Sequence, residues 1–191
     1  MTHDTREGWL TAAIEELRPI FEAVGKPLPK AIRVACGFPL NAKRSKAIGE
    51  CWIASASADG TIEILISPVL SHPLKVFEVL VHELCHATSG AFNHGINFQK
   101  TAALMGLAPA GGGRETWKAT TGNSTFADSY GSIIDGLLAY PHSQLTYADK
   151  KTQGTRMLKA VCPSCAYTVR LTAKWAAQGL PTCPCGDTLS L

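Results

Sequence analysis

The residues of this chain best suited to chemistry lie in the segment His82-Glu83-Leu84-Cys85-His86. On an α-helix, positions four residues apart lie one above the other, so both imidazoles can reach one zinc ion at roughly 2.0 to 2.1 Å. Glu83 would lie about 100° around the helix from His82, beside the metal without being forced to bind it. The pattern therefore predicts a zinc site in which Glu83 activates a bound water molecule.

A third protein ligand is expected, because hydrolytic zinc usually has three plus water. The nearest candidate is His94, which seven residues separate from the motif. Ser89-Gly90 can end the first helix and turn the chain back toward the metal. Asn93 and Glu78 are alternatives of lower rank. Glu78 precedes the motif by one helical turn, and we expect it to hydrogen-bond an imidazole instead of the metal.

A second metal site is predicted from four cysteines near the C-terminus, in Cys162-Pro-Ser-Cys165 and Cys183-Pro-Cys185. The two pairs are seventeen residues apart, close to the spacing of a zinc ribbon in which four thiolates hold one ion. A structural zinc would stabilise a segment of about forty residues whose apolar content is too small for unaided folding. The second pair is CxC where CxxC is usual, so Asp187 is an alternative ligand.

The remaining cysteines, Tyr140 and His142 are expected to have structural roles instead of catalytic ones. Cys36, Cys51 and Cys85 stand alone in apolar surroundings and are expected to be small buried hydrophobic residues. Tyr140 and His142 could donate a hydrogen bond to an oxyanion, but packing or surface roles suit them better.

The elements before the motif are predicted from periodicity. Apolar residues recur every three or four positions over residues 7–24, which indicates an amphipathic helix that Pro19 should kink or restart. Strand-like runs follow at residues 31–38, 48–57 and 61–67. The turn signal at residues 58–60 predicts that the last two runs form a β-hairpin.

The elements that carry the site come next. The motif helix should begin at Ser71-His72-Pro73 and run to about Thr88, and a second helix should span residues 94–105 and end at Gly106. Residues 108–131 are rich in Gly, Thr, Ser and Ala and are predicted to form a long loop. A short helix at residues 132–140 and a polar, basic linker at residues 143–156 complete the expected order.

Positive charge is concentrated at the end of the chain. Residues 150–191 carry a net charge of +5 and the preceding 149 residues −2. This imbalance predicts an anionic partner, nucleic acid first, and the alternative is a merely solvated surface. The proposed phosphate-binding residues are Lys150, Lys151, Arg156, Lys159, Arg170 and Lys174.

Composition and the N-terminal segment predict a cytoplasmic protein. Of all residues 46% are hydrophobic and 17% charged, which is typical of a folded soluble chain. The charged segment 1–7 does not have the pattern of a secretory signal. Glutamates and histidines interrupt the most apolar region, residues 76–91, so no membrane span is expected. In a reducing compartment the cysteines are expected to be metal ligands and buried thiols instead of disulfides.

Three segments together resemble a known protein family. His-Glu-Leu-Cys-His-Ala at residues 82–87, His94-Gly95-Ile-Asn-Phe98 and Ala102-Ala-Leu-Met-Gly106-Leu107 are similar to the SprT-like zinc metallopeptidases. This family includes the Spartan-type proteases, which degrade DNA–protein crosslinks. The resemblance extends to the terminal zinc ribbon and covers most of the chain from Leu17 onward, except residues 108–131. It implies a zincin fold, His94 as the third zinc ligand, and peptide hydrolysis linked to nucleic acid.

Together these features predict an α+β protein with a zincin-like metallopeptidase domain over residues 1–145. Residues 146–191 would form a basic linker and a four-cysteine zinc ribbon. One zinc would be catalytic and the other structural, and the substrates would be DNA-associated proteins. The alternative function is a non-catalytic, zinc-containing protein that binds nucleic acid or acts in transcription. Such a protein would have no need of the Glu83 carboxylate.

Overall fold

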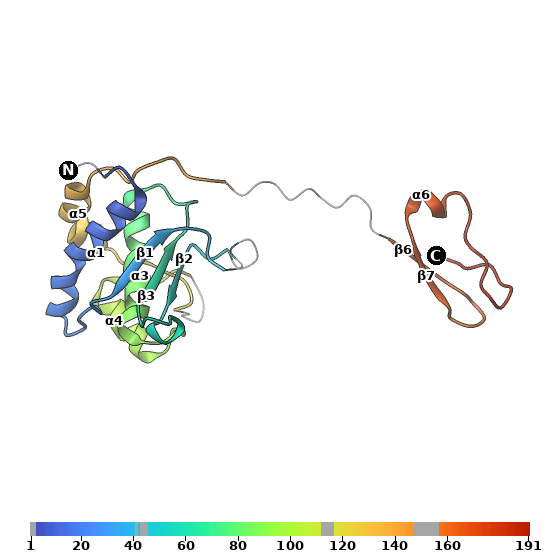
Figure 1. Ribbon diagram of the computed structural model, residues 1–191, viewed down its shortest axis with the longest axis horizontal. Coiled ribbons are helices and arrows are strands. Elements are labelled where there is room, and N and C mark those ends of the chain that lie inside the picture. Colours follow the sequence, from blue (N-terminus) through green and yellow to red (C-terminus); the bar gives the residue numbers. More distant parts are fainter. Residues whose placement is uncertain (1–2, 41, 43–45, 112–116, 147–156) are drawn as a thin grey trace. The chain divides into compact units, whose positions relative to one another are not determined.

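The computed structural model of the chain describes residues 3–40, 42, 46–111, 117–146 and 157–191 (Figure 1). The chain divides into two compact units, Met1–Tyr147 and Ala148–Leu191. The first unit mixes helices with two small sheets, and the second holds a two-stranded sheet and one short helix. In the described residues, no helix is both long and apolar enough to cross a membrane.

The main sheet of the first unit has three strands in the order β1-β3-β2. Strand β1 (Ile32–Cys36) runs parallel to β3 (Ile62–Ile66), and β2 (Gly49–Trp52) runs antiparallel to β3. The predicted pairing of the last two strand-like runs is confirmed. The second run is nevertheless shorter than expected, because Ala54–Ala56 forms a 3-10 turn. Among the described strands, β2 pairs only with β3 and lies at an edge of the sheet.

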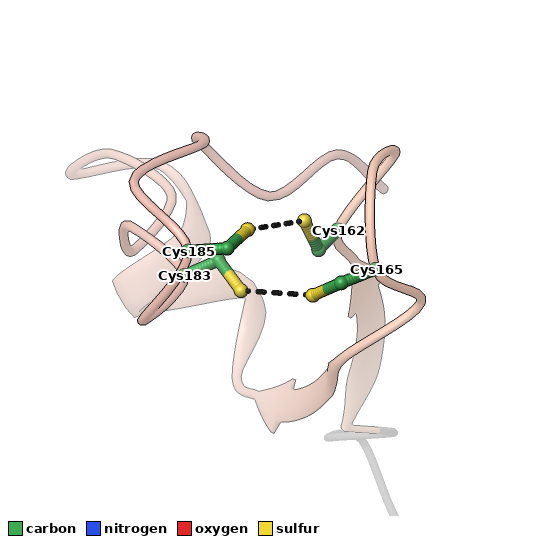
Figure 2. A group of neighbouring side chains, drawn as sticks. All are labelled: Cys162, Cys165, Cys183 and Cys185. Carbon is green, nitrogen blue, oxygen red and sulfur yellow. Dashed lines mark hydrogen bonds between the residues drawn. The ribbon is translucent and has the colours of Figure 1, made fainter.

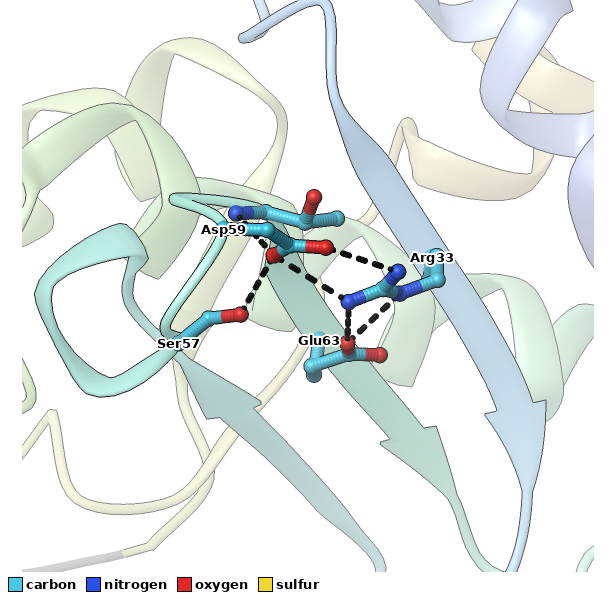
Figure 3. A network of polar contacts seen from close by, with 5 residues as sticks. Arg33, Ser57, Asp59 and Glu63 are labelled. Carbon is cyan, nitrogen blue, oxygen red and sulfur yellow. Dashed lines mark hydrogen bonds and ion pairs between the residues drawn. The ribbon is translucent and has the colours of Figure 1, made fainter.

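Exposed polar residues connect the strand β1 to the turn before β3 (Figure 3). Arg33 of β1 contacts Asp59 at 3.1 Å, and its Nε donates to Glu63 at 2.6 Å. Asp59 also accepts from the Ser57 hydroxyl at 2.7 Å and from the Thr61 amide at 3.0 Å. These bonds, that of Ser57 first, lower the pKa of Asp59. The turn predicted at residues 58–60 is therefore present and is organised by the Asp59 carboxylate.

Two helices cover the sheet, and a third helix packs on both of them. Helix α1 (Arg6–Ala23) packs on β1, α3 (Pro73–Ser89) packs on β2 and β3, and α5 (Phe126–Leu137) contacts both helices. Helix α1 begins where the Thr5 hydroxyl accepts from the Gly8 amide at 3.0 Å, and it continues through Pro19 as one element. Of the two expectations for Pro19, a kink or a restart, the restart is therefore wrong.

The buried aromatic residues join these helices into one core. The Trp9 ring of α1 meets Phe77 of α3 edge to face at 6.4 Å between centroids. Phe77 in turn contacts Phe126 and Tyr130 of α5 at 6.4 and 5.3 Å. Because large apolar side chains each contribute about 1.5 to 3 kcal/mol when fully buried, this cluster fixes α3 firmly against its neighbours.

The prediction of a long loop over residues 108–131 is wrong. Strands β4 (Leu107–Pro109) and β5 (Thr120–Gly122) form an antiparallel ribbon, and α5 already begins at Phe126. Three-residue strands are too short to show an alternating pattern, which explains why the sequence did not reveal them. A β-carbon on Gly122 would lie 2.7 Å from the Phe126 side chain, so the ribbon needs glycine there.

The second unit consists of β6 (Leu158–Val161), β7 (Thr168–Leu171) and α6 (Ala173–Ala176). Strands β6 and β7 are antiparallel. Among the residues that the structure describes in this unit, the core consists of four buried side chains, those of Ala160, Cys162, Cys183 and Leu189. A core this small indicates that the unit depends on something other than apolar burial.

Candidate metal centres and the adjoining cleft

Helix α3 and the start of α4 (Ile96–Leu104) bring the three predicted histidines together. His82 and His86 are one turn apart on α3, which ends at Gly90 with a positive φ of 64°. The chain then reverses, so that His94 meets both. The Nε2 atom of His94 lies 3.2 Å from Nε2 of His86 and 3.2 Å from Nε2 of His82.

This spacing fits a tetrahedral metal ion. Ligand nitrogens at 2.0 to 2.1 Å from zinc are separated by about 3.3 Å when the angles are tetrahedral. The two nitrogen separations of 3.2 Å are close to that value. Many catalytic zinc sites have three protein ligands, as here, and keep a fourth position for water or substrate. The three histidines therefore form a group that can hold a metal ion.

The protonation of the rings favours metal binding. The Nδ1 atom of His86 lies 3.0 Å from the Ala91 carbonyl, which can only accept, so Nδ1 carries the proton and Nε2 presents a lone pair. Burial, and then the neighbouring histidines, lower the pKa of His82 to about 3. Burial likewise lowers the pKa of His86 to about 4, although the Ala91 carbonyl opposes it. The pKa of His94 is also lowered, by burial and then by the Lys118 charge.

One proton on the Nε2 of His94 can serve only one of its two contacts, at His86 or at His82, whereas a metal ion between the rings accounts for both.

The residue that orients His82 is Thr120 of β5, whose hydroxyl oxygen lies 2.7 Å from Nδ1. The expectation that Glu78 would bind an imidazole is wrong. Its carboxylate accepts from Lys75 at 2.6 Å and from the Thr121 hydroxyl at 3.5 Å. Thr120 was missed because the ribbon that carries it was taken for a loop. Asn93, the other alternative ligand, accepts from the Gly95 amide at 2.9 Å.

Glu83 lies beside the histidine group and is only 5% exposed. Burial, and then the Glu50 carboxylate, raise the pKa of Glu83 to about 8. The edge strand β2 approaches this carboxylate closely. A β-carbon on Gly49 would overlap the Glu83 carboxylate and would lie 2.7 Å from Cγ1 of Val79. Gly49 is a second site residue that the sequence did not indicate, since only the strand packing reveals it.

A cleft of about 580 Å³ opens onto the three histidines and Glu83. Residues 46–51 form one wall, and residues 118–120 and Phe92 contribute others. The described lining includes two lysines, Lys46 and Lys118, but neither Tyr140 nor His142. Tyr140 is buried with its ring 5.2 Å from that of Trp9, which confirms the packing role expected of it.

The four C-terminal cysteines also converge (Figure 2). The Sγ atoms of Cys162 and Cys185 are 3.5 Å apart, and those of Cys165 and Cys183 are 3.3 Å apart. These separations are far longer than the roughly 2.05 Å of a disulfide and close to the roughly 3.8 Å between thiolates on a tetrahedral zinc. The four-cysteine group can therefore hold a metal ion.

Both cysteines of the CxC pair face the group, despite the unusual spacing. Asp187 holds the two cysteine loops together instead. Its carboxylate accepts from the Ser164 hydroxyl, and its carbonyl accepts from the Cys183 amide at 2.7 Å. The backbone amide of Asp187, and then the sulfurs of Cys183 and its neighbours, lower the pKa of Cys185 to about 7. Thiolate formation, which metal binding requires, is thereby eased at Cys185. At Cys183 the Cys185 backbone amide acts in the same direction, but burial and the neighbouring thiols outweigh it and raise the pKa to about 12.

The isolated cysteines behave largely as expected. Cys51 and Cys85 are buried, and burial raises the pKa of the Cys51 thiol to about 12. Cys36 is only half-buried, and its sulfur accepts from Arg6 at 3.4 Å, so the expectation of full burial is wrong for it.

Three of the six proposed phosphate-binding residues lie in the described part of the second unit. Lys159 and Arg170 are directly opposite each other on β6 and β7, and both side chains are exposed. Lys174 lies on α6 with its Nζ 5.4 Å from the centre of the Trp175 ring. The other three, Lys150, Lys151 and Arg156, lie outside the described residues.

Comparison of the chain with models of known protein families, with characterised proteins and with solved structures finds no match.

Proposed function

We propose that the protein is a zinc-dependent endopeptidase whose first unit has a zincin-like fold of the SprT-like type. The observation that carries the proposal is the convergence of three imidazole nitrogens beside the buried carboxylate of Glu83, at the base of an open cleft. A structural zinc site usually has four protein ligands and needs no cleft beside it. Here three ligands leave a position open, and a carboxylate stands next to it.

The roles of the side chains follow from their surroundings. His82, His86 and His94 would hold the zinc ion, which would supply the Lewis acidity that polarises a carbonyl and acidifies water. Thr120 keeps the His82 ring oriented through Nδ1. Glu83 accepts a proton from the attacking water and returns it to the leaving amine. Burial favours its protonated form, and a bound dication would favour its ionised form, so the two effects together would suit it to carry a proton in both directions.

The proposal is tested by comparing hydrolysis of an unfolded protein by the wild type and by the Glu83→Gln variant. The alternative function, a non-catalytic zinc protein that binds nucleic acid, predicts no hydrolysis by either protein. Both interpretations predict bound zinc, so metal content alone does not separate them.

Replacing Gly49 by Ala is expected to lower hydrolysis about 100-fold, because the added methyl group must displace the Glu83 carboxylate. Zinc content should not change, since the atoms nearest to the new methyl belong to Glu83 and Val79 and to none of the histidines. Gly131→Ala on α5 is the matched control, because nothing lies within 4 Å of its β-carbon. Kinetics of all three proteins provide the measurement. Activity of Gly49→Ala within twofold of wild type would show that Gly49 does not position Glu83.

We further propose that the second unit binds nucleic acid and brings the peptidase to DNA-associated proteins. The supporting observation is that Lys159 and Arg170 lie side by side on one face of a small unit, with Lys174 also exposed. The predicted basic linker, outside the described residues, adds Lys150, Lys151 and Arg156.

Affinity of the full-length protein for duplex DNA should fall steeply with salt, by a slope of about −0.9 per phosphate contact. Replacing Lys159, Arg170 and Lys174 together by Ala should flatten that slope by up to about two to three units. Zinc content serves as the folding control, because none of the three replaced residues belongs to the four-cysteine group that would hold zinc. Absence of measurable binding at low salt would mean that these charges only solvate the surface.

A further inference from the structure

Exposed aromatic side chains gather at the edge of the catalytic cleft. Trp52, at the end of β2, and Phe92, in the connection between α3 and α4, meet edge to face with their centroids 6.3 Å apart. Contact with each other does not bury them: Trp52 is 36% exposed and Phe92 57%. Leu40, whose amide donates to the Glu50 carboxylate at 2.9 Å, is also exposed, at 63%. Apolar surface that folding leaves in water beside a cleft is typical of a binding surface.

The aromatic pair reaches the proposed catalytic site through Phe92, because Trp52 is not among the described lining residues of the cleft. Phe92 lines the same cleft as the histidines and lies two residues before His94. Trp52 follows Glu50, another lining residue, by two positions on β2. Cys51 between them is 6% exposed and points into the core, so Glu50 and Trp52 share the opposite face of the strand.

An extended peptide can add to a sheet edge through main-chain hydrogen bonds, and pockets for its alternate side chains then give specificity. Strand β2 is such an edge among the described strands, and it ends at Trp52. A peptide along β2 that crosses the zinc site would therefore place one of its side chains against the aromatic pair.

The charges near the pair are of both signs, so they do not select a basic side chain. Aromatic faces attract cations as well as apolar groups, so both are chemically reasonable. Lys118 lines the cleft, and its charge acts on His94, two residues from Phe92. The Glu50 carboxylate, on the Trp52 face of β2, offsets this ammonium group, so the exposed apolar surface of the pair decides which class of side chain binds.

We propose that Trp52 and Phe92 form a binding site for a large apolar side chain of the substrate, a few residues from the peptide bond that is cut. This inference rests on the proposed peptidase function. It goes further by naming the class of segment that is cleaved: unfolded peptide containing aromatic or branched aliphatic residues.

The first test maps the bonds that are cut in an unfolded protein by the wild type and by Phe92→Ala, using mass spectrometry. Wild-type sites should be enriched in Phe, Tyr, Leu or Ile at one fixed position, and the enrichment should disappear in the variant. Leu104→Ala is the matched control, because Leu104 is 56% exposed on α4 and is not among the lining residues of the cleft. It should retain the wild-type pattern.

The second test measures rates on two synthetic peptides that differ only by Phe or Ala at the enriched position. Phe92→Ala should lower kcat/KM for the Phe peptide about 10- to 100-fold and leave that for the Ala peptide nearly unchanged. Phe92→Leu should retain much of the preference. Wild-type cleavage without preference, enrichment of Lys or Arg, or equal loss in Phe92→Ala and Leu104→Ala would each overturn the inference.

A binding measurement separates this inference from the peptidase function on which it rests. Zinc-loaded Glu83→Gln protein should bind a Phe-containing peptide at least tenfold more tightly than the matched Ala peptide, and Phe92→Ala in that background should remove the difference. If the wild type cuts nothing, the proposed function fails. If Glu83→Gln protein binds the two peptides equally, the inference about Trp52 and Phe92 is overturned, whatever the wild type cuts.

Discussion

Replacing Glu83 by Gln is expected to lower the rate of peptide hydrolysis by about 10²- to 10⁴-fold, the range that general acid–base catalysis contributes. Glutamine keeps the size of the side chain, so the packing against Gly49 and Val79 is preserved. It cannot accept a proton, and the carboxylate is the group that lies next to the three imidazoles. Zinc content should remain at the wild-type value, because His82, His86 and His94 are unchanged.

Glu78→Gln is the matched control for this experiment. Glu78 is on the same helix and also lines the cleft, but its carboxylate is paired with Lys75 at 2.6 Å. We expect this variant to retain activity within an order of magnitude of wild type. If Glu83→Gln and wild type hydrolyse the substrate at equal rates, Glu83 is not the base. If neither hydrolyses it, the non-catalytic alternative is correct.

Replacing Cys162 and Cys165 by Ser is expected to remove one of two zinc ions and to unfold the second unit. Structural zinc contributes about 10 to 16 kcal/mol to the folding of comparable small domains, and the apolar core of this unit is too small to replace it. The first unit should keep its own zinc and its thermal transition. Metal analysis gives the stoichiometry, and proteolysis of the C-terminal segment reports its unfolding.

Ser143→Ala is a suitable control for that experiment, because it replaces a hydroxyl outside both metal groups. The Arg6 contact to residue 143 uses the backbone carbonyl and survives the change. Loss of both zinc ions from the cysteine variant would contradict two independent sites. A wild-type content of one zinc, lost only when the histidines are replaced, would contradict a metal in the ribbon.

The sequence predicted the parts of the site that depend on local geometry. His82, Glu83 and His86 lie on one helix, where their spacing alone determines which atoms meet. His94 was reachable by the same reasoning because Gly90 ends α3 a few residues earlier. The cysteine pairs were also recognised by spacing, and the CxC departure did not prevent convergence of all four sulfurs.

The parts that the sequence did not reveal depend on contacts between distant segments. Thr120 reaches His82 across 38 residues, from a strand too short to recognise. Gly49 is needed only because β2 packs against α3, a relation that no local pattern encodes. Glu78 was assigned to an imidazole from helix geometry, yet Lys75, three residues earlier, pairs with it instead. Trp52 and Phe92 likewise meet only in the folded chain.

The most direct test of the central claim is hydrolysis of an unfolded protein by the Cys162→Ser, Cys165→Ser variant after complete removal of metal and return of one zinc per chain. This variant isolates the histidine group, so any metal-dependent activity must arise there. We predict no hydrolysis by the metal-free protein, recovery at one equivalent of zinc, and no recovery when His94 is also replaced by Ala. Hydrolysis that persists without metal, or that zinc restores equally well without His94, would contradict the assignment of His82, His86, His94 and Glu83 as the catalytic centre.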